Sequence, residues 1–316
     1  MADARRRALL ALIAACVACR APHDAAGGLP VETQHVTELA GDGPQLLCIV
    51  AHPDDETTFA ATLYCTAMHL GGAADLVVIT NGEGGYKYST LAEPLYGIEL
   101  TREEVGRAEL PAIRARELAA GCRILRVRDL YFLGQRDHRY TTDEHEVLEP
   151  TAGVWDLGAV RAALHELLRA RHYDFVLTLA PTPGTHGHHK AATILALDAV
   201  ATLAPEERPV VLCGDTRDKD EPATDFDELG GYPQTRLLPG ELVFDRTRPL
   251  GYEGRLDYRI VAAWAIAEHK SQGTLQLEGS HEREVYRVFE GGPSDARERA
   301  AAFFAALAAE PAAPRP

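Results

Sequence analysis

The chain has 316 residues, of which 46% are hydrophobic and 25% charged, so it is long enough for one large α/β domain or two small ones. Its formal net charge of -15 argues against nucleic acid and against an anionic membrane surface as partners. Acidity alone names no partner, because many soluble enzymes are acidic.

The first predicted element is an export signal. The basic segment ADARRR precedes the apolar segment ALLALIAACVAC, which is too short to span a bilayer. Small residues before Cys16 and Cys19 resemble the lipobox of bacterial lipoproteins, so we predict a lipoprotein-type signal peptide over 1–19. The alternative is an ordinary signal peptide cut between residues 21 and 26. We therefore expect an exported protein, either a periplasmic or cell-surface lipoprotein attached to the membrane only through its lipid anchor, or a secreted protein.

The rest of the chain divides into three parts. Residues 20–42 are rich in small residues, Gly and Pro, which predicts a flexible tether. A single folded domain is predicted over 43–310, and a disordered tail over 311–316. Cysteines in the domain show no CxxC spacing, and we interpret them as free buried thiols. These are Cys48, Cys65, Cys122 and Cys213.

Apolar runs of strand length alternate with segments of helical periodicity along this domain. The predicted strands are 45–51, 75–80, 129–134, 174–180 and 208–214. The predicted helices are 56–70, 101–122, 156–172, 188–204, 256–272 and 294–310. Thr101 and Glu104 have capping-box spacing, and Ser294 is a candidate N-cap. Residues 81–99 are predicted to form a long loop, and the segment after Gly214 an irregular excursion.

Strands that are apolar on both faces and alternate with helices predict a mainly parallel sheet covered by helices on both faces. Ligands of such folds bind beyond the carboxyl ends of the strands. The segments HPDD (52–55) and THGHH (185–189) both follow predicted strands. We therefore expect them to meet at one edge of the sheet.

These two segments carry the residue types of a metal site. A catalytic zinc takes three protein ligands and leaves one position to water. His52 and Asp55 at a strand-to-helix turn can supply two ligands, and one of His186, His188 and His189 the third. The alternative for each residue is a solvated group at a helix start.

Asp54 is adjacent to a predicted ligand and can act as the general base of a hydrolase, since zinc lowers the pKa of bound water to about 7. A second imidazole near the metal can stabilise the oxyanion. Together these groups can hydrolyse an amide or an ester. The alternative for Asp54 is a helix N-cap. Glu56 is expected in the first helical turn, where it favours the helix dipole.

Several segments, in order over about residues 45–275, resemble the PIG-L or LmbE-like family of zinc-dependent de-N-acetylases. They are AHPDDE, TNGEGG, RARELAAGCRIL, LYFLGQRD, THGHHKA and AEHKSQ. The resemblance implies a Rossmann-like α/β fold, so that 43–310 would be the catalytic domain. It also implies hydrolysis of N-acetyl groups, mostly from substrates that contain N-acetylglucosamine.

Carried over by position, the resemblance implies that His52, Asp55 and His189 bind zinc, one ion per chain, although iron(II) or cobalt suits the same ligands. It implies that Asp54 is the general base and that His186 stabilises the tetrahedral intermediate. The expected substrate is an N-acetylated sugar or glycoconjugate. The alternatives are an amidase acting on a thiol conjugate or an acylated natural product, and a carbohydrate-binding lipoprotein without catalysis.

Less specific matches add candidate substrate contacts. Arg114 and Asp137 match positions that contact the sugar in relatives, although Arg114 can equally be a surface helix residue and Asp137 a turn residue. His269 and Gln272 match a further motif of unassigned role. The chain departs from the family where many relatives have Pro-Asp, because Gly187 and His188 stand there. This departure leaves open what would hold His186 protonated, with Asp137 or a later acid as candidates.

Overall fold

The computed structural model describes residues 31–39 and 41–309. The predicted signal peptide with Cys16 and Cys19, the start of the predicted tether and the predicted tail lie outside the described residues. Within the described part of the chain, no helix combines the length and the apolar character needed to cross a membrane.

Ten strands and nine α-helices make up most of the described chain. The strands are β1 (Glu32–His35), β2 (Gln45–Val50), β3 (Ala73–Thr80), β4 (Asp129–Gln135), β5 (Phe175–Leu179), β6 (Val210–Arg217), β7 (Leu242–Asp245), β8 (Pro249–Gly251), β9 (Leu256–Asp257) and β10 (Arg283–Val288). The helices are α1 (Ala60–Met68), α2 (Glu93–Tyr96), α3 (Glu103–Leu125), α4 (His145–Leu148), α5 (Leu157–Ala170), α6 (Gly187–Ala201), α7 (Arg259–Glu268), α8 (Leu275–Glu278) and α9 (Ala296–Ala308). Short 3-10 turns are η1 (Asp55–Phe59), η2 (Glu83–Tyr88), η3 (Pro205–Glu207) and η4 (Pro233–Thr235).

The main sheet has eight strands in the order β1-β4-β3-β2-β5-β6-β10-β7. The five strands from β4 to β6 run parallel. Antiparallel strands flank them, with β1 on β4 at one side and β10 and then β7 beyond β6 at the other. This confirms a mainly parallel sheet in a single α/β domain.

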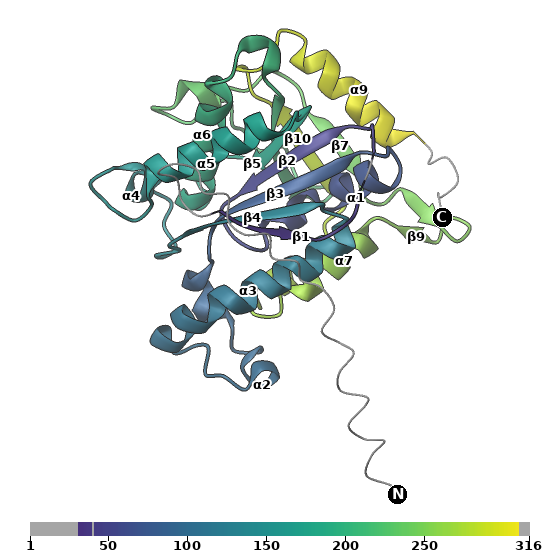
Figure 1. The fold of residues 1–316 in the computed structure, drawn as a ribbon. Coiled ribbons are helices and arrows are strands. Elements are labelled where there is room, and N and C mark those ends of the chain that lie inside the picture. Colours follow the sequence, from purple (N-terminus) through teal and green to yellow (C-terminus); the bar gives the residue numbers. More distant parts are fainter. Residues whose placement is uncertain (1–30, 40, 310–316) are drawn as a thin grey trace, which may run out of the picture.

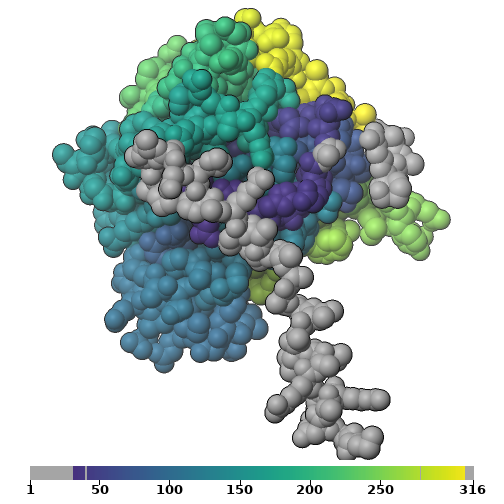
Figure 2. All heavy atoms as spheres, in the orientation of Figure 1, coloured from purple at the N-terminus to yellow at the C-terminus, as the bar shows by residue number. Residues whose placement is uncertain are grey.

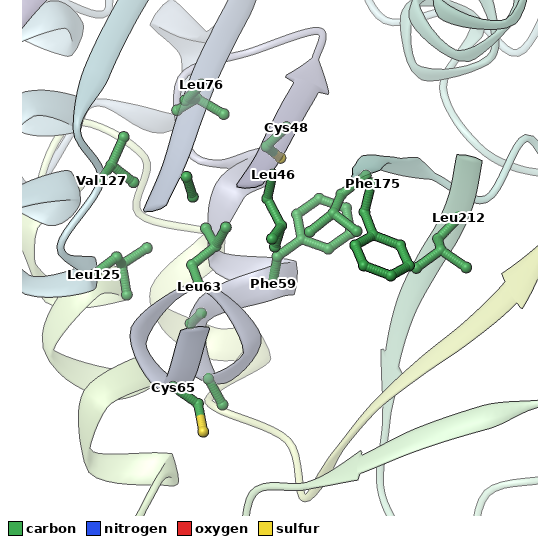
Figure 3. Packing of buried hydrophobic residues seen from close by; sticks show 14 of the residues in the cluster. Leu46, Cys48, Phe59, Leu63, Cys65, Leu76, Leu125, Val127, Phe175 and Leu212 are labelled. Carbon is green, nitrogen blue, oxygen red and sulfur yellow. The ribbon is translucent and has the colours of Figure 1, made fainter. Parts of the chain in front are cut away.

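Helices cover both faces of the sheet (Figure 1). One hydrophobic core lies between the sheet and helices α1, α3, α7 and α9, and the other between the sheet and helices α5 and α6. Figure 3 shows part of the first core, where Phe59 lies beside Leu46 and Phe175. Since every residue of β3 is buried, the apolar run LVVI over 76–79 reflects a strand with core on both faces.

The five predicted strands and six long predicted helices are all present, with shifted ends. The helix predicted over 56–70 begins with the 3-10 turn η1 before α1. The segment predicted to be a loop over 81–99 contains η2 and α2. Together with the start of α3 it forms the blue protrusion at the lower left of Figure 2.

Five strands were not predicted: β8 and β9, which form a separate two-stranded sheet, and the three strands that flank the main sheet. The tether prediction is wrong at 32–35, because β1 pairs there with β4. Strand β7 lies within 214–256, which is predicted to be an irregular excursion, and β10 lies between the last two predicted helices, where no element is predicted. All three are antiparallel additions at the flanks of the sheet, where half-exposed residues obscure the apolar pattern of a parallel strand.

Two capping predictions are also wrong. Helix α3 begins after Arg102, and the Thr101 hydroxyl donates instead to Glu93 at 2.5 Å. Helix α9 begins after Asp295, without a capping bond from a side chain. The prediction about the cysteines is confirmed. Within the described residues the four thiols are free and buried.

Candidate active site

A cavity of about 580 Å³ opens at the carboxyl end of the parallel strands. Residues from both predicted segments line it, so the two strand ends do converge. The cavity wall includes His52, Asp54 and Asp55 from the turn after β2, and Thr185, His186 and His189 from the loop before α6 and its first turn. Most of the predicted site residues therefore face one space.

His52, Asp55 and His189 place one ligand atom each within 4.8 Å of the others. Nδ1 of His52 lies 3.1 Å from Nε2 of His189. That same Nε2 lies 3.1 Å from Oδ1 of Asp55. Two imidazoles and a carboxylate are the ligand types that a catalytic divalent zinc takes, so the donor set fits the predicted metal.

Backbone contacts hold the Asp55 carboxylate in place. Its Oδ2 accepts hydrogen bonds from the backbone N–H groups of Ala51 at 3.0 Å and His52 at 2.8 Å. The other oxygen, Oδ1, therefore remains available to bind a metal ion. Although burial raises the pKa of Asp55, the neighbouring His189 and His52 outweigh it and hold that pKa well below its usual range. The group is a carboxylate, as a metal ligand must be.

Asp54 adopts φ = 132°, a backbone conformation that costs free energy in a residue with a side chain. Its carboxylate pairs with the Arg114 guanidinium at 2.9 Å. Asp54 occupies the N-cap position of η1, as the alternative interpretation expected, but its side chain makes no capping bond. Burial raises the pKa of Asp54 to about 6, against the opposing charge of Arg114. The strained turn thus presents a half-buried carboxylate beside the predicted metal ligands.

Arg114 lines the cavity, yet its side chain is almost fully buried, so the surface-helix interpretation is wrong. Besides Asp54, its guanidinium donates hydrogen bonds to the carbonyls of Gly82 at 2.6 Å and of Pro53. These contacts join helix α3 to the turns that follow β2 and β3. Arg114 therefore fixes the position of the Asp54 carboxylate.

His186 also lines the cavity. Its Nδ1 accepts a hydrogen bond from the backbone N–H of His188 at 3.1 Å, which leaves the ring proton on Nε2. Burial and the nearby His52 and His189 lower the pKa of His186 to about 2. Among the described residues no carboxylate forms an ion pair with it. His186 can therefore donate from Nε2 without a carboxylate partner, and the burial of its ring favours the neutral form.

Asp137 is buried beside the imidazoles and is part of the cavity wall. Its Oδ2 accepts a hydrogen bond from the Gly84 N–H at 3.1 Å, and its Oδ1 lies 3.5 Å from Nδ1 of His188. It also belongs to a second group of potential ligand atoms, which comprises His52, Asp137, His186 and His188. Asp137 is therefore part of the imidazole cluster, and it is more than the turn residue of the alternative interpretation.

Sequence reasoning missed the partner of Glu56. Nε2 of His269 lies 2.6 Å from Oε1 of Glu56, and both side chains are fully buried. Glu56 does occupy the first turn of η1, but it pairs across the core rather than facing solvent. The AEHKSQ motif, which contains His269, was the available signal that this segment belongs near the site. Its Gln272 lines the cavity.

Sequence reasoning also missed His138 and Glu146. Nδ1 of His138 lies 2.9 Å from Nε2 of His188, and Nε2 of His138 lies 2.9 Å from Oε2 of Glu146. The DHR segment after β4 gave no sign of these contacts, because a single histidine in a polar loop is common.

Residues 47–200 match the family model described as PIG-L: GlcNAc-PI de-N-acetylase. They are a PIG-L domain. This family consists of deacetylases that act on N-acetyl amide bonds, so the chain is an enzyme of that class. The match contains the two segments with the predicted metal ligands, Arg114 and the His138 loop, and it ends within helix α6.

A curated relative of the PIG-L domain is the probable N-acetyl-alpha-D-glucosaminyl L-malate deacetylase 2 of Bacillus subtilis. It is 25% identical over 177 residues, which are 56% of this chain and 70% of that protein. Among solved structures, the zinc-inhibited form of teicoplanin deacetylase Orf2 has a TM-score of 0.48 at 17% identity, covering 77% of this chain and 97% of that one. GalB, the 4-carboxy-2-hydroxymuconate hydratase of Pseudomonas putida KT2440, has a TM-score of 0.41 at 19% identity, covering 54% and 65%.

Proposed function

We propose that the protein is a zinc-dependent hydrolase that removes the acetyl group from an N-acetylated sugar of the N-acetylglucosamine type. The observation that carries the proposal is the convergence of His52, Asp55 and His189 within a PIG-L domain, with the half-buried carboxylate of Asp54 beside them. The Bacillus relative, which is named for an N-acetylglucosaminyl substrate, supports this choice of sugar.

The side chains around His52, Asp55 and His189, here called the triad, have distinct tasks. A bound zinc ion would supply a Lewis acid and lower the pKa of water to about 7. Asp54 accepts the proton of the attacking water, and its ion pair with Arg114 keeps the carboxylate oriented. His186 donates its Nε2 proton in a hydrogen bond to the carbonyl oxygen as negative charge develops there.

The charges of the cavity wall restrict the rest of the substrate. Two arginines line the cavity, and both are already paired. Arg114 binds Asp54, and Arg246 binds Glu284 and the carbonyls of Thr57 and Thr58. Four carboxylates face the same space, those of Asp54, Asp55, Asp137 and Asp215. We infer that the group attached to the sugar is uncharged or cationic, because the described wall offers no free cation to an anion.

The proposal is tested by metal analysis and acetate release with the purified protein. We expect about one zinc per chain, loss of acetate release with a chelator, and its return with added zinc. His189→Ala should lose both the zinc and the activity. The matched control is His172→Ala, which removes an imidazole whose side chain is 73% exposed. Turnover that persists in fully metal-free protein would contradict the proposal.

A substrate panel tests the acyl group and the charge inference. It pairs N-acetylglucosaminides that differ only in a neutral or a carboxylate-bearing aglycone, and adds an amide of a thiol conjugate. We expect kcat/KM to be at least about tenfold higher for the neutral glycoside, equal to about 1.4 kcal/mol. Preference for the carboxylate-bearing glycoside would contradict the charge inference. Turnover of the thiol conjugate alone would show that the protein is an amidase rather than a sugar deacetylase.

We also propose that the enzyme works outside the cytoplasm, on the basis of the N-terminal sequence. Expression in a bacterial host followed by fractionation tests this proposal. Radiolabelled palmitate in the protein that is lost in Cys16→Ser or Cys19→Ser would identify the lipidated cysteine. Recovery of the intact, unlabelled chain in the cytoplasm would contradict export.

A further inference from the structure

A row of three imidazoles leads away from the proposed metal site and ends on a carboxylate. Nε2 of His52 lies 3.0 Å from Nδ1 of His188, whose Nε2 lies 2.9 Å from Nδ1 of His138. Nε2 of His138 lies 2.9 Å from Oε2 of Glu146. Each ring therefore uses both nitrogens, and the row joins the turn after β2, helix α6, the loop after β4 and helix α4.

The environment of the row changes from the core to the surface. The side chain of His188 is fully buried, that of His138 is 13% exposed, and that of Glu146 is 26% exposed. The Trp155 ring lies 5.3 Å from the His188 ring and shields it on the α5 side. His188 thus has no access to water and depends on its two imidazole neighbours for hydrogen bonds.

The carboxylate at the outer end determines the direction of the row. An ionised carboxylate only accepts hydrogen bonds, so Nε2 of His138 must donate. The hydrogen bond from His138 helps to hold the pKa of Glu146 below its usual range. Arg139 and Thr141 also donate to Glu146, at 2.9 to 3.0 Å, and keep its carboxylate in place.

Each neutral ring then determines the protonation of the next. With its proton on Nε2, His138 offers the Nδ1 lone pair to His188 and requires His188 to donate from Nε2. His188 in turn offers Nδ1 to His52 and requires His52 to donate from Nε2. The Nδ1 lone pair of His52 is then free on the side where Asp55 and His189 lie, which is the side of the proposed metal.

We propose that His188, His138 and Glu146 are positioning residues that fix the tautomer and orientation of His52 so that its Nδ1 faces the metal. Metal-ligating histidines usually donate their other ring N–H to a carboxylate or carbonyl. Here His52 donates to the imidazole of His188, which donates to that of His138, and His138 donates to the carboxylate of Glu146. The inference rests on the proposed metal site but not on the identity of the substrate.

Asp137 is the competing acceptor. Its Oδ1 lies 3.5 Å from Nδ1 of His188 and 4.0 Å from Nε2 of His52, both longer than the imidazole contact of 3.0 Å. Its other oxygen is held by the Gly84 N–H. If Asp137 were the true partner of His188, the proton of that ring would be on Nδ1. The two arrangements therefore differ at one observable atom.

The first test measures the tautomers directly in metal-free protein. Two-bond nitrogen–proton correlation spectra of protein with labelled histidines, recorded at mildly alkaline pH, distinguish the two forms of each ring. We expect His138, His188 and His52 all to carry the proton on Nε2. A proton on Nδ1 of His188 overturns the proposal. Because this test needs neither metal nor substrate, it remains decisive even if the deacetylase proposal fails.

The second test measures zinc affinity by competition with a chromogenic chelator. Glu146→Ala and His138→Phe should each weaken zinc binding by about tenfold, the usual lower bound for such outer contacts. His188→Asp, which returns an acceptor to Nε2 of His52, should bind zinc more tightly than His188→Phe. The matched control is Glu149→Ala, one turn away, whose carboxylate lies 3.6 Å from the exposed His145. Unchanged zinc affinity in both Glu146→Ala and His138→Phe overturns the proposal.

Discussion

Two polar clusters lie at opposite ends of the same parallel strands. At the amino end, Asp75 accepts from Arg128 at 2.8 Å, from Arg171 at 2.8 Å and from the Tyr173 hydroxyl at 2.7 Å. Arg171 also pairs with Asp129 at 2.7 Å. Two acids and two arginines thus balance each other's charge.

The carboxyl-end cluster is not balanced in this way. Asp54, Asp55 and Asp137 line the cavity around the triad, and of these three only Asp54 pairs with a guanidinium among the described residues, that of Arg114. The backbone of Asp54 is strained as well. In a cluster that stabilises the fold, the charges balance one another. The carboxyl-end cluster instead has carboxylates and imidazole nitrogens that can bind a cation. Variants of the carboxyl-end cluster should therefore lose activity, and variants of the amino-end cluster should lose stability.

The largest expected effect follows from Asp54→Asn. The amide cannot accept the proton, so kcat should fall by about 10²- to 10⁴-fold, the range for a general base. Zinc content should hardly change, because Asp54 is not in the predicted ligand set. Acetate release and metal analysis check this, with Asp198→Asn on helix α6 as the control. Normal turnover in Asp54→Asn would remove the role given to Asp54.

The amino-end cluster should respond in the opposite way. Asp75→Ala leaves Arg128 and Arg171 without their shared carboxylate and should reduce the unfolding free energy by about 2 kcal/mol. We expect less than the 3–5 kcal/mol of fully buried pairs because Arg171 is 36% exposed. Urea unfolding measures this, and zinc content should be unchanged. The control is Asp227→Ala, whose side chain is 81% exposed. Loss of zinc in Asp75→Ala would mean that the two clusters are not separate.

Arg114→Gln tests the link between charge and catalysis at the carboxyl end. The guanidinium favours the carboxylate form of Asp54, whose pKa burial otherwise raises to about 6. Removing the positive charge raises that pKa, so the acidic limb of the kcat profile should move to higher pH. We also expect kcat at its plateau to fall by about tenfold, because the base loses its orienting partner. An acidic limb that moves to lower pH would contradict this assignment.

The sequence predicted the site where chain topology alone brings residues together. His52 and His189 follow parallel strands, and parallel strands end at one edge, so their meeting needed no knowledge of side-chain packing. The fold class followed from the same alternation of strands and helices. The flanking strands β1, β7 and β10 escaped prediction, because their pairing depends on neighbours far away in the chain.

Contacts between helices were beyond sequence reasoning. The partner of Glu56, His269, is 213 residues away and meets it only because α7 packs on α3 and η1. An acid in a first helical turn already has a local explanation, so the pattern gave no reason to seek another. Arg114 was left ambiguous for a similar reason, since helix periodicity does not say whether a long side chain is buried.

The smallest expected effect concerns the pH dependence of the Glu56–His269 pair. Burial alone lowers the pKa of His269, but the Glu56 carboxylate outweighs burial and raises it above 6.5. A histidine whose pKa is raised on folding contributes stability that is fully present below its unfolded pKa and is lost as the pH rises through its folded pKa. The wild type should therefore exceed His269→Gln in unfolding free energy by about 1 kcal/mol more at pH 6 than at pH 9.

Urea unfolding at the two pH values measures this difference. The control is His172→Gln, which removes an imidazole whose side chain is 73% exposed. Metal binding cancels in the comparison, since both proteins retain the triad. A difference that grows toward pH 9 would show that His269 is held neutral, and Glu56 would then accept a hydrogen bond rather than form an ion pair.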